Sequence, residues 1–406
     1  MKRPAHGALH ACFFSHASDL GGGAERSLVE LAEHLTEHFG VSCSFIVPER
    51  TGALVTRLRD AGISTHPVRM DWWCTTGEES LDARNERLRA SAAALKKAFR
   101  QDLPALRADV FFTNTVTIPW GAAAANLANR PHIWCIREWN DTFTFGEPLA
   151  LTTSFLRTAS SKVLTNSEAV KRAWFGRRGR GVGVLYPSPR VPPWVEAAQG
   201  HFSIPGALRV MVLGRIAKQK GQIEAIRAVA ELVRAGHNVE LALVGGISQA
   251  YLDDLLRTIE ASKLGDRLGI FEATPSPLAS LASADVVVVP ARNEPFGRVP
   301  VEAMLLGKPV IAARSGGLTE IVRPGEGLLY RPGDAAGLAR QIARLARQPT
   351  LAARVAKVGC ASAKRRFNLE RSARLLYRCL QSVRDQGAPN SPQLRAFMKT
   401  MRLLDA

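Results

Sequence analysis

Residues 289–304 read VPARNEPFGRVPVEAM and contain the pattern from which the fold can be predicted. The apolar run that ends at Val289 predicts a buried strand that stops at Pro290. A helix is expected to begin around Val299, because proline is favoured in a first turn and Pro300 follows directly. A buried strand, a loop and a helix in this order are typical of the βαβ unit of a parallel sheet.

Two glutamates flank the turn from this strand to this helix. Glu294 lies in the loop, and Glu302 is expected on the first turn of the helix. Main-chain amides near residues 296–299 can bind phosphate oxygens at a helix start, and the carboxylate of Glu302 can accept two hydrogen bonds from a vicinal diol such as a ribose. Two glutamates at this spacing occur by chance in most chains. Their position between a buried strand and a helix start is what favours a ligand site.

Short apolar runs alternate along the chain with longer segments of helical periodicity. Because strands that are apolar on both faces belong to parallel sheets covered by helices, this rhythm predicts the α/β class. The predicted strands are 8–14, 44–47, 109–112, 133–136, 162–164, 209–213, 240–244 and 285–289.

Prolines interrupt this rhythm between residues 186 and 205, which indicates a linker between two α/β halves. We therefore predict an amino-terminal Rossmann-like domain over 1–188, a linker over 189–206, a second Rossmann-like domain over 207–386 and a flexible tail over 387–406. The ligand is expected in a cleft between the two domains, at the carboxyl ends of both sheets.

A glycine-rich loop, LGGGAER at residues 20–26, follows the first predicted strand. Glycine lets a ligand approach the main chain, and the N–H groups at a helix start point outward, so Gly22 and Gly23 suit a phosphate or a sugar. An ordinary strand-to-helix turn would contain the same glycines, and both interpretations stay open. The spacing does not match the dinucleotide-binding fingerprint.

The second domain opens in a similar way. Its first predicted strand, 209–213, is followed by Arg215, Lys218 and Lys220 before the next helix. Cations at the carboxyl end of a buried strand make a pocket for a doubly charged anion, in which arginine can bind two phosphate oxygens at once. The alternative is a solvated basic turn, since a chain with 54 basic residues forms some such turns by chance.

The composition describes a basic, globular chain. Of its 406 residues 46% are hydrophobic, which excludes a disordered protein, and 54 Lys and Arg against 36 Asp and Glu give a net charge of +18. Such a charge favours phosphorylated ligands, an anionic membrane surface or nucleic acid. Six scattered cysteines predict no disulfide framework and a reducing, cytoplasmic compartment. We expect neither a signal peptide nor a membrane-spanning helix.

Taken together, the motifs resemble the retaining glycosyltransferases of GT-B architecture, family 4 type, also called glycosyl transferases group 1. The resemblance implies two Rossmann-like domains that face each other across a cleft, and transfer of a hexose-type sugar from a nucleoside diphosphate sugar without a metal or other cofactor. It rests on GGAER at 22–26, GR at 214–215, KG at 220–221, LVGG at 243–246, the two glutamates 294 and 302, GKPVIA at 307–312 and GGLTEIV at 316–322.

The resemblance also implies roles for individual residues. Arg215 and Lys220 would neutralise the diphosphate leaving group, and Glu294 would lie beside the transferred sugar, so these three are the catalytic candidates. Glu302 would hold the ribose hydroxyls, and the main chain near Glu272 would read the base. The candidate donor-binding residues, several of them acting through backbone amides, are Gly22, Gly23, Glu272, Phe296, Gly297, Arg298 and Glu302.

One departure from the family pattern concerns the first domain. Many members carry histidines after two of its strands, where this chain has Asn114 and Arg137. Asn114 can donate to a sugar hydroxyl and Arg137 can supply positive charge, so both are candidate acceptor or sugar contacts. Neither is a ready general base near neutral pH. The alternative interpretation of these two residues is purely structural: a capped strand end and a surface ion pair.

We therefore expect a hexosyltransferase that acts on a glycan or lipid-linked acceptor in cell-surface polysaccharide or glycolipid assembly. Between Arg340 and Arg378 there are eleven basic residues and one acid, Glu370. This excess of positive charge favours contact with the inner face of the membrane. The alternative is that these residues are the solvated faces of packed helices. Alternatives are a basic membrane- or nucleic-acid-binding protein on the same scaffold, although no nucleic-acid motif supports it, and a sugar-nucleotide epimerase.

Overall fold

The computed structural model describes residues 8–75, 77, 79–177 and 179–404, and these form two compact units. Unit 1 runs to Pro187 and resumes at Leu369, and unit 2 comprises Ser188–Asn368. The predicted second domain, 207–386, therefore extends too far, because the helix that begins at Leu369 packs on unit 1. The predicted linker, 189–206, is the first part of unit 2 and contains no helix or strand.

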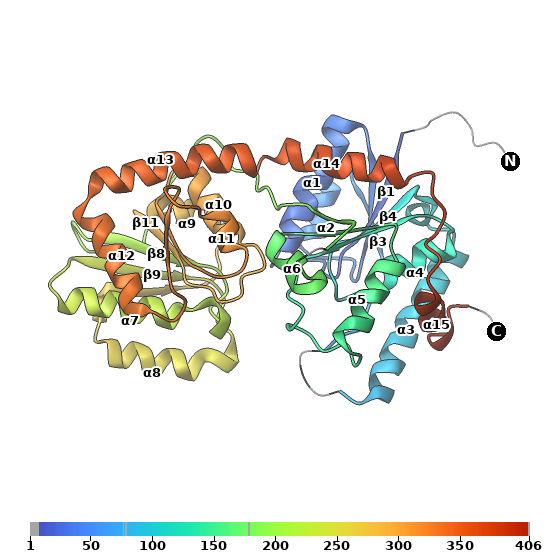
Figure 1. Ribbon diagram of the computed structural model, residues 1–406, viewed down its shortest axis with the longest axis horizontal. Coiled ribbons are helices and arrows are strands. Elements are labelled where there is room, and N and C mark those ends of the chain that lie inside the picture. Colours follow the sequence, from blue (N-terminus) through green and yellow to red (C-terminus); the bar gives the residue numbers. More distant parts are fainter. Residues whose placement is uncertain (1–7, 76, 78, 178, 405–406) are drawn as a thin grey trace. The chain divides into compact units, whose positions relative to one another are not determined.

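Unit 1 is built on a parallel sheet with strand order β3-β2-β1-β4-β5-β6-β7. Its strands are β1 His10–Phe14, β2 Ser42–Val47, β3 Ser64–Pro67, β4 Val110–Thr113, β5 His132–Ile136, β6 Lys162–Thr165 and β7 Val182–Val184. Helices cover the sheet (Figure 1): α1 Gly23–Phe39, α2 Ala53–Asp60, α3 Leu81–Arg100, α4 Trp120–Leu127, α5 Leu149–Thr158 and α6 Glu168–Phe175.

Both faces of this sheet are apolar. Successive residues of a strand point to opposite faces, and in β1 Cys12 and Phe14 join one buried cluster while Phe13 joins the other. The ring of Phe13 stacks on that of Phe45 in β2, with centroids 5.2 Å apart. Burial on two faces explains why the central strands are continuous apolar runs, and it confirms the predicted α/β class.

The last helices of the chain also belong to unit 1. Helix α14, Leu369–Val383, packs against α1 (Figure 1). Helix α15, Pro392–Thr400, contacts α4 and α5, and its Leu394 and Met398 are fully buried. The prediction of a flexible tail over 387–406 is therefore wrong for the described part of that segment, because its apolar side chains complete the core of unit 1.

Unit 2 contains a second parallel sheet, with strand order β10-β9-β8-β11-β12-β13. Its strands are β8 Leu208–Leu213, β9 Val239–Val244, β10 Leu268–Phe271, β11 Val286–Val289, β12 Val310–Ala313 and β13 Leu328–Tyr330. Its helices are α7 Gln222–Arg234, α8 Leu252–Ser262, α9 Pro277–Ser283, α10 Arg298–Leu305, α11 Leu318–Ile321, α12 Ala335–Arg347 and α13 Pro349–Arg366. A short 3-10 helix, η2 Lys218–Lys220, precedes α7.

A buried histidine lies inside the sheet of unit 1. His132 Nε2 is 2.9 Å from Thr113 Oγ1, and its Nδ1 is 3.2 Å from Ala159 O. Burial lowers the pKa of His132 from 6.5 to about 3, although the bond to Ala159 O opposes the shift. Between these pH values the unfolded chain binds a proton that the folded unit does not, so stability is lost as the pH falls from about 6.5 towards 3.

We expect the free energy of unfolding of unit 1 to fall between about pH 7 and about pH 4.5, with about 3 kcal/mol of the loss due to His132. Urea unfolding followed by tryptophan fluorescence measures this, because six of the seven tryptophans lie in unit 1. In the His132→Gln variant this part of the pH dependence should disappear, whatever the stability at neutral pH. An unchanged pH dependence would contradict a buried neutral imidazole.

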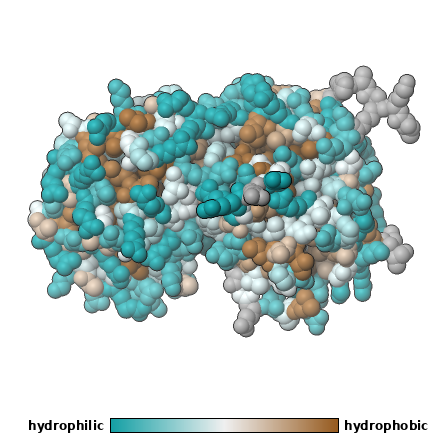
Figure 2. Space-filling view, in the orientation of Figure 1, coloured by the Kyte–Doolittle hydropathy of each residue, from teal (hydrophilic) through white to brown (hydrophobic). Residues whose placement is uncertain are grey.

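The face of the molecule seen in Figure 2 is mainly hydrophilic, with smaller hydrophobic areas on both units. No helix among the described residues is long and apolar enough to cross a bilayer. The prediction of no signal peptide rests on the start of the chain, of which residues 1–7 lie outside the described residues, and it stays a prediction.

Candidate functional site

The catalytic candidates of unit 2 follow two neighbouring strands. Because β8 pairs with β11, the segments after their carboxyl ends meet at one edge of the sheet. Gly221, the N-cap of α7, comes so close to the end of β11 that an added Cβ would lie 2.2 Å from Pro290 O, and its φ of 74° also favours glycine. Arg292 N donates to Gln219 O at 2.8 Å and ties the two segments together.

Lys220 and Glu294 form an ion pair at this edge. Lys220 Nζ lies 2.6 Å from Glu294 Oε2. The lysine side chain is 33% exposed and the glutamate 12%. The main chain of Glu294 is fixed as well, because its carbonyl oxygen accepts a hydrogen bond from Gly317 N at 2.8 Å. A held carboxylate therefore positions an accessible ammonium group where an anionic ligand can reach it.

Glu302 also has a basic partner. Arg298 Nε donates to Glu302 Oε1 at 3.0 Å. The Glu302 side chain is buried and that of Arg298 nearly so, with 6% and 10% exposed. The two residues are one turn apart on the same face of α10. The helix begins at Arg298, one residue earlier than predicted, so Glu302 lies just beyond its first turn. Arg298 was predicted as a main-chain contact, and the structure adds a role for its guanidinium group.

The segment Pro-Phe-Gly between the two glutamates is closely packed. Phe296 is 2% exposed, and its ring meets that of Phe367 at 5.5 Å, so its side chain belongs to the core. Gly297 is the N-cap of α10 with a φ of 99°. A Cβ on Gly317 would lie 2.6 Å from Pro295 O. The glycines therefore let the two loops that follow β11 and β12 touch.

Arg215 and Glu272 follow two other strand ends of unit 2. Arg215 comes just after β8 and is exposed, and its carbonyl oxygen accepts a hydrogen bond from Gln222 Nε2 at 2.9 Å. Glu272 is exposed and comes directly after the edge strand β10, which β9 separates from β8. The donor candidates of this unit thus lie along the carboxyl ends of the strands from β10 to β11.

In unit 1 the structure brings Asn114 and Arg137 into contact. Each is the first residue after a strand, β4 and β5 respectively. Arg137 Nε donates to Asn114 Oδ1 at 2.8 Å, and Asn114 Nδ2 donates to Ala24 O at 3.1 Å. Arg137 is only 6% exposed, so the alternative of a surface ion pair is wrong for this residue. Its Nη2 is buried and has no hydrogen-bond partner among the described residues.

The glycine loop lies next to this pair. Gly22 is the N-cap of α1, and a Cβ there would lie 2.3 Å from Glu25 Oε2. The buried Glu25 is in turn 3.3 Å from His16 Nε2. Gly23 is the first residue of α1, directly before Ala24. Gly22 and Gly23 therefore belong to the same group of residues as Asn114, whereas the other donor candidates belong to unit 2.

Two polar residues near Arg137 were not predicted from the sequence. Asn166 follows β6 as Asn114 follows β4, and its Nδ2 donates to Arg137 O at 3.0 Å. Glu138 accepts hydrogen bonds from Thr115 Oγ1 at 2.6 Å and from Val116 N at 3.0 Å. Asn166 could have been predicted from its position directly after a strand, since polar residues that follow parallel strands gather at the carboxyl ends of the sheet.

Among the described residues no group of three or more His, Cys, Asp or Glu side chains gathers as ligands of a metal ion would. The expectation that no metal is required stays a prediction.

The chain was compared with protein families and with curated proteins, and the family match lies in unit 2. The family model of glycosyl transferases group 1 matches residues 199–360. The 2-deoxystreptamine glucosyltransferase of Streptomyces kanamyceticus is 35% identical over 39% of this chain and 42% of its own length. The D-inositol 3-phosphate glycosyltransferase of Acidothermus cellulolyticus is 37% identical over 43% of this chain and 44% of its own length. The chain thus spans less than half the length of the curated relatives it matches.

Solved structures resemble the chain over most of its length. The Anabaena protein HepE, crystallised with UDP and glucose, has a TM-score of 0.72 and 24% identity over 92% of this chain and 100% of its own. Sucrose-phosphate synthase from Thermosynechococcus elongatus has a TM-score of 0.70 and 22% identity over 92% of this chain and 99% of its own. The two helix-covered parallel sheets are thus those of the GT-B fold, and residues 199–360 match the model of the glycosyl transferases group 1.

Proposed function

We propose that the protein is a retaining glycosyltransferase that moves a hexose-type sugar from a nucleoside diphosphate sugar to a glycan or lipid-linked acceptor, in cell-surface polysaccharide or glycolipid assembly. The observation that carries the proposal is the Lys220 and Glu294 pair at the strand ends of unit 2, followed by the Arg298 and Glu302 pair on α10. Both pairs lie inside the segment that matches the glycosyltransferase family.

The charges of the site suit the chemistry of sugar transfer. The bond between the anomeric carbon and the phosphate oxygen breaks, and its electron pair stays on the departing diphosphate. Arg215 and Lys220 act as fixed cations that stabilise this negative charge. The acceptor hydroxyl bonds to the anomeric carbon on the same face of the sugar, and its proton passes to the departing phosphate. Glu294 holds Lys220 and lies beside the sugar.

Donor recognition would use the rest of the sheet edge in unit 2. The carboxylate of Glu302 accepts hydrogen bonds from the ribose hydroxyls, and the main chain near Glu272 lies beside the base. HepE, whose fold this chain shares, was crystallised with UDP and glucose. UDP-glucose is therefore the first donor to test.

The acceptor side would use unit 1. In this proposal Asn114 and Arg137 contact the acceptor or the sugar. The observation that supports it is the buried Nη2 of Arg137, which lacks a hydrogen-bond partner among the described residues. Since neither side chain is a general base near neutral pH, the leaving phosphate is the group that takes the proton. The enzyme acts in the cytoplasm, at the inner face of the membrane, which the net charge of +18 would favour.

Nucleotide binding tests the donor site directly. UDP, GDP and ADP are compared by thermal shift, and the cognate nucleotide should raise the melting temperature of the full chain. In Glu302→Gln the affinity should fall by about 10- to 100-fold, because hydrogen bonds from the ribose to a charged acceptor are weakened. Glu260→Gln is the matched control, since Glu260 is an exposed glutamate on α8.

If no nucleoside diphosphate raises the melting temperature, or if Glu302→Gln binds the cognate nucleotide as tightly as Glu260→Gln, the donor site is wrongly placed. If the nucleotide binds but neither transfer nor donor hydrolysis follows with any acceptor glycan or lipid, a binding protein on this scaffold becomes the better interpretation.

A further inference from the structure

A second group of basic residues lines a cavity of unit 2 to which none of the candidate donor residues contributes. The cavity encloses about 300 Å³. It lies beside β13, the edge strand of the sheet, and is lined by the segment 323–329, by α12 and by the start of α13. Its arginines, called here the arginine cluster, are Arg314, Arg323, Arg344 and Arg354.

The described lining of this cavity offers the arginine cluster no acidic partner. All four side chains are exposed, and no Asp or Glu lines the cavity among the described residues. Glu326, the acid of the adjoining segment, bonds to Arg366 and Ser362 instead. Like charges that gather at one place repel one another. A bound anion would remove this repulsion.

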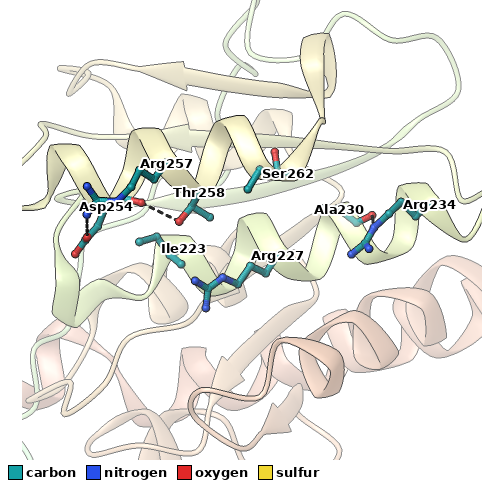
Figure 3. A pocket seen from close by; sticks show the side chains of 9 residues that line it. Ile223, Arg227, Ala230, Arg234, Asp254, Arg257, Thr258 and Ser262 are labelled. Atoms are coloured by element: carbon teal, nitrogen blue, oxygen red, sulfur yellow. Dashed lines mark hydrogen bonds and ion pairs between the residues drawn. The ribbon is translucent and has the colours of Figure 1, made fainter.

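A groove between α7 and α8 in the same unit offers a contrast (Figure 3). Arg227, Arg234 and Arg257 line it, but so does Asp254, which accepts a hydrogen bond from Arg257 Nη2 at 2.5 Å. Arg234 Nε donates to Ala230 O at 3.2 Å. Two of these arginines therefore have partners within the protein, whereas the side chains of the arginine cluster have no hydrogen-bond or ion-pair partner among the described residues.

The floor of the cavity beside β13 is apolar. Leu328 and Leu329 of β13 line it together with Leu351 and Val355 of α13, and the last two are buried. The four guanidinium groups are exposed, but an anion bound among them would face this apolar floor on one side, where water screens their attraction less than in open water. The combination of an apolar floor and a cationic rim suits a phosphorylated ligand.

We propose that the arginine cluster binds a diphosphate group at a site separate from that of the sugar donor. A phosphate monoester carries about 1.5 to 2 negative charges near neutral pH, so a single phosphate would leave about half of the four guanidinium charges unbalanced. A diphosphate comes closer to balance, and each guanidinium can contact two of its oxygens. The diphosphate belongs either to a soluble ester or to the head group of a lipid.

Calorimetric titration with inorganic pyrophosphate tests the site. The full chain carries Arg215→Ala and Lys220→Ala in this experiment, so that the donor site does not contribute. Pyrophosphate should still bind in this background, and the added pair Arg344→Ala and Arg354→Ala should weaken binding by at least about 10-fold. The control pair Arg227→Ala and Arg257→Ala removes the same charge from the α7–α8 groove and should leave the affinity unchanged.

Vesicles distinguish the two sources of the diphosphate. Sedimentation with phosphatidylcholine vesicles, with and without diacylglycerol pyrophosphate, is compared for the same variants. If pyrophosphate binds and the binding depends on Arg344 and Arg354, the site exists and takes a soluble ligand. If only the vesicles with diacylglycerol pyrophosphate bind, and this binding depends on the same two arginines, the site exists and takes a lipid head group. If neither binding depends on these two arginines while the melting temperature is kept, the proposal is overturned. The single variant Arg323→Gln repeats the test if the pair fails to fold.

Discussion

Replacement of Lys220 by alanine is expected to lower kcat/KM for sugar transfer by about 10²- to 10³-fold, the effect of removing one fixed charge-stabilising group from a reacting centre. Lys220 is accessible and is held 2.6 Å from Glu294. Its loss removes a cation that meets the departing diphosphate and leaves the carboxylate of Glu294 without its ammonium partner, so that this carboxylate repels the donor. Release of nucleoside diphosphate from the sugar nucleotide measures the change.

Lys218→Ala provides the matched control. Lys218 lies on the same turn, η2, and is exposed, so its removal changes the local charge equally without breaking the contact with Glu294. Its activity should stay close to that of the parent, and Lys220→Arg should recover part of the loss because it keeps the charge. Equal losses in Lys218→Ala and Lys220→Ala would point to a general charge effect and would remove Lys220 from the catalytic candidates.

The double substitution Leu394→Ala and Met398→Ala is expected to lower the free energy of unfolding of unit 1 by about 5 kcal/mol. Both side chains are fully buried where α15 packs on α4 and α5. Each substitution removes apolar surface from the core and leaves a cavity. Urea unfolding followed by tryptophan fluorescence reports the loss, because the rings of Trp120 and Phe397 lie 5.9 Å apart at this contact.

Arg395→Ala with Lys399→Ala serves as the comparison on the same helix. Both side chains are exposed, and substitutions at such positions change stability by only about 0.5 kcal/mol each. A loss of similar size in the two double variants would mean that α15 is not part of the core of unit 1.

The central strands could be predicted from the sequence because burial on both faces leaves a continuous apolar run. β11, for example, reads VVVV and is fully buried along its length. Four of the five strands that were not predicted, β3, β7, β10 and β13, are the edge strands of the two sheets. The fifth, β12, is buried along its length and was missed although it is an apolar run. β3 reads STHP, and β7 and β13 have only three residues each, because an edge strand packs against fewer neighbours and needs fewer apolar residues.

The places of the candidate residues in the fold could also be predicted, since Arg215, Lys220 and Glu294 come after the buried strands β8 and β11. That these residues form the functional site stays a prediction. The pairings could not be predicted. Lys220 and Glu294 are 74 positions apart, and their contact depends on β8 lying beside β11 and on the close approach of Gly221 to Pro290. The burial of Arg137 depends on an asparagine that a different strand supplies. The fit of α15 likewise depends on helices far away in the sequence.

The route of the chain through the two units affects how the protein can be made. Unit 2 is one uninterrupted segment, whereas unit 1 is assembled from two segments that flank it. As a ribosome extends the chain from its amino terminus, every strand of unit 2 leaves the exit tunnel before α14 and α15 have been translated. During that interval the surfaces of α1, α4 and α5 that these helices cover stay exposed to solvent. The core of unit 1 can therefore be completed only after α14 and α15 have left the ribosome.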